Sequence, residues 1–147
     1  MNETNILRPF FKLRQHSIEK YTVEAEAIQH KVLQHLLGKA AETEWGLKYG
    51  YRTIKDYLGY SQRVPVQTYE EIKGYVDRMR HGEKNILWPG NVVWYAKSSG
   101  TTNDKSKFIP VSKEGLQTVH YAGGRDAVAL YLQQNPKSRI FSGRTLI

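Results

Sequence analysis

The 147-residue sequence predicts an α/β fold in which a helix-rich start is followed by a strand–loop–strand unit. Two stretches in the first half carry apolar residues at three- and four-residue steps, the pattern of amphipathic helices. Residues 92–96 are rich in β-branched and aromatic side chains, which favours a strand, and residues 107–111 form a second short apolar run. We therefore expect helices over residues 1–85, a strand–loop–strand unit with a helix over 86–136, and the start of further strands over 137–147.

The first predicted helix spans residues 17–37, and its apolar residues form a single stripe. Acidic side chains on its polar face argue against binding to an anionic membrane, so we interpret it as a helix that packs on a core. A shorter helical turn follows over residues 40–45, and Gly46 and Gly50 are predicted to end it. The stripe consists of Ile18, Tyr21, Ala25, Ile28, Val32 and Leu36, widened by Leu33 and Leu37.

The second predicted helix begins at Thr68, because Thr68 and Glu71 have the spacing of a capping box, and Gly82 ends it. A short helix is predicted before it, over residues 54–58. After it, the sequence LWPG at residues 87–90 predicts a turn, because proline and glycine suit its two middle positions. The apolar face of the second helix consists of Tyr69, Ile72, Val76 and Met79.

Ser112 is a good N-cap for a third predicted helix that runs to Gln134. The glycine pair at residues 123–124 interrupts this helix, and we favour the close approach of a neighbouring backbone as the reason. The alternative is an opening that faces a substrate. Residues 139–141 and 145–147 are then predicted to be extended. The apolar face of the third helix consists of Leu116, Val119, Ala127 and Leu130.

The loop between the two predicted strands has the side chains expected of a polyphosphate site. Gly100 allows a positive φ angle and lets the backbone come close to a ligand. Successive backbone N–H groups in such a turn form an anion-binding concavity, to which hydroxyl groups and a lysine add donors and charge. Lys105 either assists or faces solvent. The candidate phosphate-binding residues are Ser98, Ser99, Gly100, Thr101, Thr102 and Lys107.

This loop differs from two commoner phosphate-binding loops. The NTPase pattern G-x-x-x-x-G-K-[ST] requires a second glycine where Lys105 stands, and the dinucleotide pattern G-x-G-x-x-G also needs glycines that the loop lacks. A polar β-turn between two strands is the structural alternative. The order of a strand, S-S-G-T-T, a short spacer, a lysine and an apolar strand ending at Pro110 is more restrictive, and it favours a phosphate loop.

Composition narrows the classes of function. The chain has no cysteine, which excludes disulfides and thiolate metal sites, and its five histidines lack the spacing of metal ligands. The net charge is +8, but the basic residues are scattered among acidic ones and form no Lys/Arg block. They also do not alternate with tyrosines, as they would in a surface that stacks single-stranded nucleic acid. The start lacks the features of a signal peptide, and no apolar run reaches transmembrane length. We therefore expect a cytoplasmic protein that binds neither nucleic acid nor a membrane.

The segment from Ser98 to Pro110 resembles the ATP-phosphate loop of adenylate-forming enzymes, in the form used by the auxin-responsive-promoter family of acyl acid amido synthetases. The resemblance extends over most of the chain and includes TEWGLKYG at 43–50, VPVQTYE at 64–70 and LWPG at 87–90. Asp104 stands where many family members have a second glycine, and the Asn-Asp pair there can still form a turn. The loop residues at matching positions are Ser98, Ser99, Gly100, Thr101, Thr102 and Lys107.

The resemblance implies a fold and a reaction. The fold is the N-terminal portion of an adenylate-forming (acyl-CoA synthetase/luciferase-like) large domain, with residues 1–147 as an incomplete part of it and the adenine pocket, the metal-binding acid and a mobile C-terminal domain beyond Ile147. The reaction is that of an ATP-dependent ligase that activates a carboxylic acid as an acyl-adenylate and conjugates it to an amino acid, with Mg²⁺ held by a ligand outside this chain. Lys107 would be the catalytic cation, and the fragment alone would be inactive.

Two alternatives belong to other classes of protein. One is a freestanding phosphate- or nucleotide-binding module in which the loop binds without catalysis. The other is a helical interaction protein or nucleic-acid-binding protein in which the loop from Ser98 to Lys107 is incidental. Binding to any polyanion that depends on salt and does not depend on Lys107 would favour the last of these.

Overall fold

The structure is a computed structural model that describes residues 3–98 and 106–143. The chain forms two compact units. The terminal unit combines residues from both ends of the chain, from the ranges 1–25 and 116–147, and the central unit holds residues 26–115.

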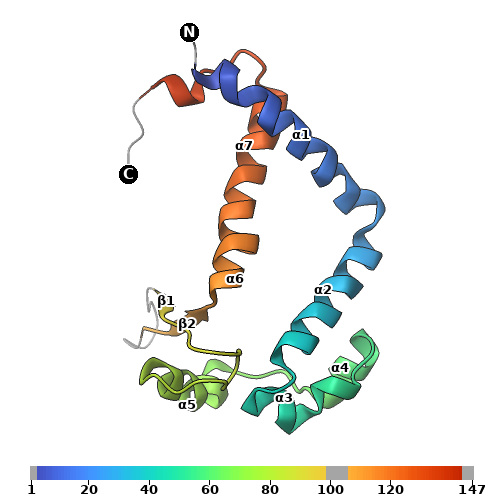
Figure 1. Cartoon of the computed structure of the whole chain (residues 1–147), viewed down its shortest axis with the longest axis vertical. Helices are drawn as coiled ribbons and strands as arrows, with labels where there is room; N and C mark the ends of the chain where they lie inside the picture. The colour runs from blue at the N-terminus through green and yellow to red at the C-terminus, as the bar shows by residue number, and fades with distance from the viewer. Residues whose placement is uncertain (1–2, 99–105, 144–147) are drawn as a thin grey trace. The chain divides into compact units, whose positions relative to one another are not determined.

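In the terminal unit, α1 (Glu3–Val23) packs against α7 (Ala122–Gln134), as Figure 1 shows. A π-helical segment, Leu116–Tyr121, precedes α7, and a 3₁₀ helix, Ile140–Ser142, follows it. The packing leaves Ala129 of α7 fully buried. The core of this unit consists of Phe11, Ala129 and Leu132, with Ile18, Val128 and Phe141 packed against it.

The first half of the central unit is helical. Thr43 begins α3 because its hydroxyl accepts a hydrogen bond from the Gly46 N–H at 3.0 Å, and Gly50, at φ 65°, ends it. A core cluster of Leu37, Ile54 and Val64, with Leu33, Tyr49, Tyr51 and Tyr60 around it, holds these helices together. The elements are α2 (Ala25–Ala40), α3 (Glu44–Tyr49), the 3₁₀ helix Tyr51–Thr53 and α4 (Tyr57–Arg63).

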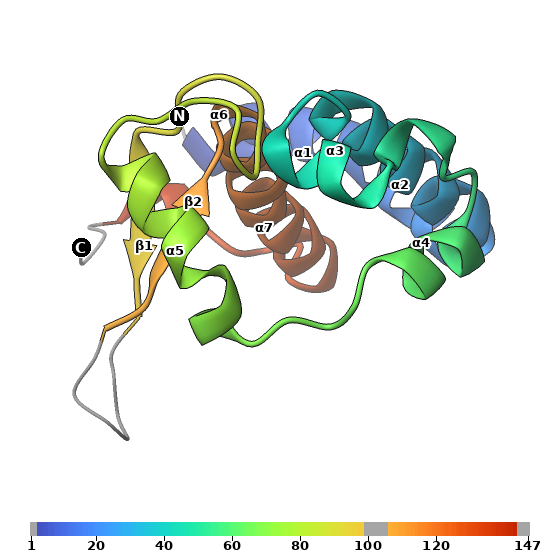
Figure 2. The ribbon, with the colours of Figure 1, turned by 90° about the horizontal axis from the view of Figure 1, so that it is seen from below.

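The second half of the central unit is a helix beside a hairpin, followed by one helical turn. In Figure 2, α5 lies beside the hairpin of β1 and β2. A second core cluster, which consists of Met79, Ile86 and Val92 with Tyr75, Leu87, Trp88 and Tyr95 around it, joins the helix to the chain that leads into β1. The elements are α5 (Tyr69–Arg80), β1 (Trp94–Lys97), β2 (Phe108–Val111) and α6 (Lys113–Gly115).

The predicted start of α5 and the predicted hairpin are both confirmed. The Thr68 side chain pairs with the Glu71 N–H, and the Glu71 carboxylate accepts a hydrogen bond from the Thr68 N–H at 2.6 Å, as a capping box requires. The Thr68 hydroxyl also donates to the Glu71 carboxylate, at 2.7 Å. β1 and β2 pair in antiparallel register, from Trp94 opposite Val111 to Lys97 opposite Phe108. The hairpin therefore brings the two ends of the predicted phosphate loop together.

The first predicted helix is wrong in its extent. The single helix expected over residues 17–37 is two helices, because α1 already begins at Glu3 and ends at Val23, and α2 begins at Ala25. A 3.6-residue count does not continue across the break at Glu24, so one stripe cannot describe both helices. Leu33 and Leu37 do face a core, but the rest of the stripe is mixed, with Tyr21, Val32 and Leu36 exposed.

Gly50 ends α3 as predicted, whereas Gly46 and the glycine pair at 123–124, which were predicted to interrupt helices, lie inside them. Gly46 is within α3, and the close approach of backbone occurs there: a Cβ at this position would stand 2.0 Å from the Ala40 carbonyl oxygen. The glycine pair at 123–124 is within α7, and among the described residues no atom outside the adjacent helix backbone lies within 4 Å of a Cβ built at either residue. The predicted backbone contact at 123–124 is therefore wrong, and the departure from α-helical geometry is the π-helical segment before it.

Three smaller predictions also differ from the structure. The short helix expected at 54–58 is α4, which starts at Tyr57, because Asp56 caps it by accepting from the Gly59 N–H at 2.8 Å. Residues 140–142 form a 3₁₀ helix where extended chain was expected, and residues 145–147 lie outside the described ranges. The apolar face predicted for the third helix is exposed at Val119 and Leu130, whereas Ala129 and Leu132 are buried.

Candidate functional site

The two described residues that bracket the predicted phosphate loop are hydrogen-bonded to each other. The Ser98 N–H donates to the Lys107 carbonyl at 3.0 Å, and the Lys107 N–H donates to Ser98 Oγ at 3.2 Å. These bonds extend the β1–β2 ladder by one residue pair beyond Lys97 and Phe108. A hydroxyl that accepts one bond retains its hydrogen for donation, so the arrangement is compatible with the predicted donor role of Ser98.

The structure brings Ser98 and Lys107 together, and the other candidate residues lie outside the part of the chain that it describes. Ser99, Gly100, Thr101 and Thr102, together with Lys105, belong to residues 99–105. The geometry of the candidate site is therefore that of its base, where the strands end.

The Lys107 side chain lies over an aromatic ring of α5. Its Nζ is 5.5 Å from the centroid of the Tyr69 ring, within the range of a cation–π contact. Lys107 is exposed, and within residues 3–98 and 106–143 it forms no ion pair with a carboxylate. Its positive charge is thus held beside the loop without being neutralised by a described acidic side chain.

The same tyrosine binds the backbone at the start of β2. The Phe108 N–H donates to the Tyr69 hydroxyl at 2.9 Å, and that hydroxyl also lies 3.5 Å from the Phe108 carbonyl oxygen. Since Ser98 and Lys107 form a hydrogen-bonded pair, the next pair in an antiparallel ladder turns its N–H groups outward, which leaves the Phe108 N–H facing away from β1. Tyr69 satisfies that group.

The other end of α5 contacts the Phe108 ring. The guanidinium carbon of Arg80 lies 3.7 Å from the ring centroid, and Arg80 also pairs with Asp77 at 3.3 Å. Nearby, burial raises the pKa of the Tyr95 hydroxyl, which donates to the Val92 carbonyl at 3.1 Å. Helix α5 therefore contacts the chain directly after the loop from both of its ends.

The sequence pattern does not predict these contacts of α5. The pattern places Tyr69 on the apolar face of its helix and gives Arg80 no role, because nothing local indicates which strand the helix packs against. One signal was available: Tyr69 belongs to the segment at 64–70, which carries part of the family resemblance together with the loop.

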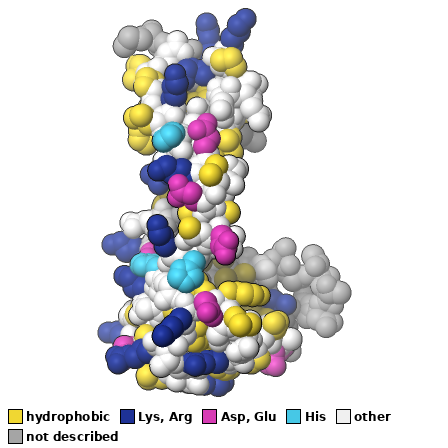
Figure 3. Space-filling view, turned by 90° about the vertical axis from the view of Figure 1, so that its right-hand side faces the viewer, with side chains coloured by type: hydrophobic (Ala, Val, Ile, Leu, Met, Phe, Trp, Pro, Cys, Tyr) yellow, Lys and Arg dark blue, Asp and Glu magenta, His cyan; other side chains and the backbone are white. Residues whose placement is uncertain are grey.

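On the face shown in Figure 3, basic side chains lie singly or in small groups with acidic side chains between them. Among residues 3–98 and 106–143, no group of three or more His, Cys, Asp or Glu side chains could hold a metal ion. A ligand set for Mg²⁺ is therefore not found in the described chain. None of the described helices has the length and apolar character needed to cross a bilayer.

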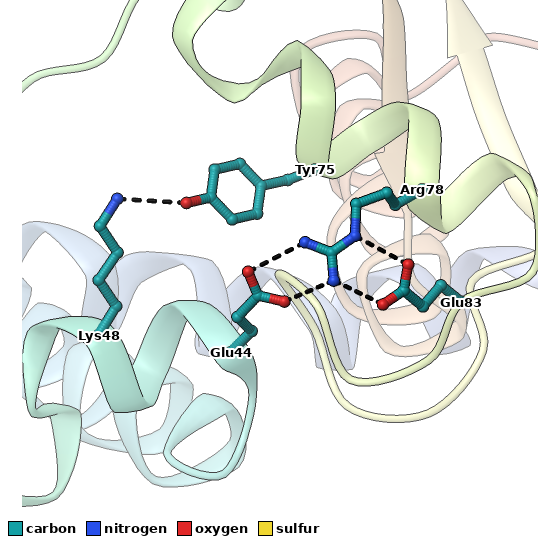
Figure 4. A network of polar contacts seen from close by, with 5 residues as sticks. All are labelled: Glu44, Lys48, Tyr75, Arg78 and Glu83. Atoms are coloured by element: carbon teal, nitrogen blue, oxygen red, sulfur yellow. Dashed lines mark hydrogen bonds and ion pairs between the residues drawn. The ribbon is translucent and has the colours of Figure 1, made fainter.

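A second polar cluster joins α3 to α5, as Figure 4 shows. Arg78 binds Glu44 through two hydrogen bonds of 3.0 and 2.7 Å, and Glu83 through two of 2.8 and 2.5 Å. These bonds lower the pKa of both carboxylates. Beside them, the hydrogen bond from Lys48 to the Tyr75 hydroxyl, at 3.2 Å, raises the pKa of Lys48. Each charge here has a partner within the chain, so we assign this cluster to packing.

Comparison with known proteins places these features in a family. A family model described as the GH3 family N-terminal domain matches residues 14–146. The indole-3-acetic acid-amido synthetase GH3.8 of Oryza sativa subsp. indica is 31% identical over 100 residues, which are 67% of this chain and 16% of that protein. The indole-3-acetic acid-amido synthetase GH3.15 of Arabidopsis thaliana is 33% identical over 101 residues, 68% of this chain and 17% of that protein.

Another relative is named for a different acyl group, the jasmonoyl group. The jasmonoyl–L-amino acid synthetase JAR4 of Nicotiana attenuata is 29% identical over 101 residues, 68% of this chain and 18% of that protein. A solved structure of the GH3.15 acyl acid amido synthetase matches with a TM-score of 0.74 and 27% identity, over 84% of this chain and 22% of that one. The likeness confirms the predicted fold class, and the chain spans less than a fifth of the length of these curated relatives.

Proposed function

This chain belongs to the GH3 family, and from that membership we propose that it contributes the ATP-phosphate loop of an ATP-dependent acyl acid amido synthetase. In this proposal residues 1–147 are an N-terminal part of the large adenylation domain. The substrates are ATP, a carboxylic acid and an amino acid acceptor. The relatives conjugate different acyl groups, as their names state, so the proposal is made for the class of acid and for no single acid.

The observation that carries the proposal is the position of Lys107. Its ammonium is exposed, lies beside the end of the β1–β2 hairpin, and has a ring rather than a described carboxylate as its neighbour. A phosphate-binding cation needs such a place, because a lysine already paired with an acid would have to give up that pair to bind an anion. Ser98, another candidate phosphate-binding residue, is hydrogen-bonded to the Lys107 backbone through its N–H and its hydroxyl oxygen, so it lies at the same end of the hairpin.

The proposed reaction has two steps. A carboxylate oxygen attacks the α-phosphorus of ATP, the bond to the bridging oxygen of the β-phosphate breaks, and pyrophosphate leaves with that electron pair. The amine of the amino acid then attacks the acyl carbon, AMP leaves, and the amine loses a proton as the amide forms. Neither step requires a covalent nucleophile from the protein.

The role of this chain lies in the first step. Negative charge grows on the β- and γ-phosphates as pyrophosphate leaves, and donors already in place stabilise it best. We assign Lys107 as the cation, Ser98, Ser99, Thr101 and Thr102 as hydroxyl donors, and Gly100 to close approach of the backbone. Mg²⁺ would be held by residues outside the described part of this chain.

The test is pyrophosphate release by the product of the complete open reading frame, with ATP and a panel of carboxylic acids. We expect acid-dependent release, and a loss on the order of 10²-fold in kcat/KM for Lys107→Ala. Lys113→Ala removes another exposed lysine, on α6 rather than in the loop, and should leave the rate unchanged. A loss in Thr101→Ala would extend the assignment to the loop hydroxyls.

Two results would overturn parts of the proposal. Release that is indifferent to Lys107→Ala and Thr101→Ala would remove the loop from the reaction. ATP binding without acid-dependent release, in the complete protein, would favour the freestanding nucleotide-binding module over the ligase.

A further inference from the structure

Tyr69 makes two different contacts with the residues at the base of the loop. Its hydroxyl accepts a hydrogen bond from the Phe108 N–H at 2.9 Å. The Lys107 ammonium lies over its ring, with 5.5 Å between Nζ and the ring centroid. One side chain thus contacts both the backbone that follows Lys107 and the charge at the end of the Lys107 side chain.

The hydroxyl contact fixes the start of β2. The Phe108 N–H faces away from β1, where a third strand would otherwise satisfy it, and an unpaired N–H in this half-buried position would be costly. The Tyr69 hydroxyl takes the place of that strand at one residue. This restrains the backbone next to Lys107 from the side opposite to the Ser98 bonds.

The position of Tyr69 is itself fixed. It is the first residue of α5, directly after Thr68, whose N–H and hydroxyl are both bound by the Glu71 carboxylate. Further along the helix, Val76 and Met79 are buried. Tyr69 is therefore presented by an anchored helix start rather than by a loop, which is the arrangement that orients a site residue well.

The ring contact limits the ammonium without neutralising it. A lysine side chain has a long flexible stem. An aromatic face attracts its ammonium, which stays charged and keeps its three N–H groups available as donors. A carboxylate partner would also hold the ammonium, but it would compete with an incoming phosphate. A ring does not compete in this way.

We infer that Tyr69 is a positioning residue that orders Lys107 for binding a nucleotide phosphate. The hydroxyl holds the backbone of the strand that carries Lys107, and the ring holds its ammonium near the loop. This inference rests on the proposed function, in which Lys107 binds the phosphates of ATP.

Two variants separate the contacts. Tyr69→Phe keeps the ring and removes the hydroxyl, and Tyr69→Leu removes both. The matched control is Tyr75→Leu, because Tyr75 lies on the same helix and its ring also contacts a lysine, Lys48, at 5.5 Å, away from the loop. A purely structural role predicts similar effects of Tyr69→Leu and Tyr75→Leu on nucleotide binding.

The first measurement needs no activity. Lysines of the complete protein are reductively methylated with ¹³C, and the Lys107 signal is identified by its loss in Lys107→Ala. We expect a ring-current shift of this signal in the wild type and in Tyr69→Phe, and its return to the position of free lysines in Tyr69→Leu but not in Tyr75→Leu. Exchange of the Phe108 amide should accelerate in Tyr69→Phe. A Lys107 signal that does not respond to Tyr69→Leu would overturn the inference.

The second measurement is a double-mutant cycle on ATP affinity. We expect Tyr69→Leu to weaken ATP binding by roughly two- to fivefold and to raise the KM for ATP more than it lowers kcat. In the Lys107→Ala background the same change should have no further effect, because Tyr69 acts through that lysine. Equal losses with and without Lys107 would overturn the inference while the proposed function stands. If the wild type does not bind ATP, the proposed function fails, and the Lys107 signal alone decides whether Tyr69 places the ammonium.

Discussion

Asp126 on α7 accepts two hydrogen bonds from the guanidinium of Arg14 on α1, at 2.6 Å from Nε and 2.9 Å from Nη2. The two side chains remain 20% and 30% exposed, respectively, so the pair is partly shielded from water. The bond to Asp126 raises the pKa of Arg14, which keeps the guanidinium charged. Because the bonds are parallel and connect the two helices of the terminal unit, they fix how α1 and α7 pack.

We expect Arg14→Ala to weaken the terminal unit by about 1–2 kcal/mol, because it leaves the half-buried Asp126 carboxylate without its partner. The measurement is hydrogen exchange, in which the amides of α1 and α7 should exchange faster while those of α5 stay unchanged. Arg52→Ala is the control, read at the amides of α3 and of the 3₁₀ helix that carries Arg52, since the Arg52–Glu42 pair has a similar distance of 2.6 Å but is 71% and 66% exposed. An equal response to both substitutions would show that burial does not matter here.

Gly46→Ala should strongly destabilise the central unit. The added methyl group would stand 2.0 Å from the Ala40 carbonyl oxygen, which is backbone and cannot rotate away. We expect a loss of about 3 kcal/mol or more in the free energy of unfolding, seen as a lower thermal midpoint or rapid proteolysis. Gly74→Ala in α5 is the matched control, because among the described residues no atom outside the adjacent helix backbone lies within 4 Å of the new group, and it should stabilise by about 0.5–1 kcal/mol. Similar midpoints for the two variants would contradict the close contact.

The stability of the central unit should fall in acid because of Glu44 and Glu83. Their pKa values are lowered in the folded state by hydrogen bonds to Arg78, from an ordinary value of 4.5. The unfolded chain therefore binds these protons at a higher pH than the folded chain does, so the stabilisation is present above about pH 4.5 and is lost as the pH falls through the lowered values.

Unfolding midpoints between pH 7 and pH 3 check this dependence. Glu44→Gln and Glu83→Gln should each flatten the acid limb, because the remaining amide cannot titrate. Both carboxylates are open to solvent, so the acid limb should also shrink at high salt. An acid limb of unchanged slope in both variants would assign the acid sensitivity to other groups.

Ser98→Ala should weaken ATP binding by the complete protein in two ways. It removes the oxygen that accepts the Lys107 N–H at 3.2 Å, and it removes the hydroxyl that we propose donates to a phosphate. Ser98→Thr keeps the hydroxyl and should keep most of the affinity. Titration of a fluorescent ATP analogue gives both values, and a threonine variant as weak as the alanine variant would show that shape, not the hydroxyl, is required.

The sequence predicted best those features whose signals are local. The capping box of Thr68 and Glu71 and the turn-separated strands around the loop depend on residues within a few positions of one another, and the structure confirms both. The family resemblance rested on short segments of the same kind and is confirmed by the match over residues 14–146.

What the sequence could not predict depends on contacts between distant residues. The break between α1 and α2 at Glu24 has no proline or glycine to mark it, while Pro9, a residue that usually ends a helix, lies inside α1. From the sequence alone, Gly46 is predicted to break a helix. The close contact with the Ala40 backbone, which explains the glycine inside α3, is visible only in the structure. In the candidate site, the contact of Tyr69 with Lys107 depends on the packing of α5 beside β2, which no periodic pattern specifies.

The outer edge of β2 has a consequence for how this protein avoids joining other chains. The residues of β2 whose backbone polar groups point away from β1 are Phe108 and Pro110, because they alternate with the residues that are hydrogen-bonded to β1. The Phe108 N–H is taken by Tyr69, and Pro110 has no N–H at all. Between Phe108 and Pro110 this edge therefore offers no free backbone donor to a strand from another molecule, which disfavours the edge-to-edge pairing that leads to aggregation. The side chain that contacts the loop base thus also covers a backbone donor on this edge of β2.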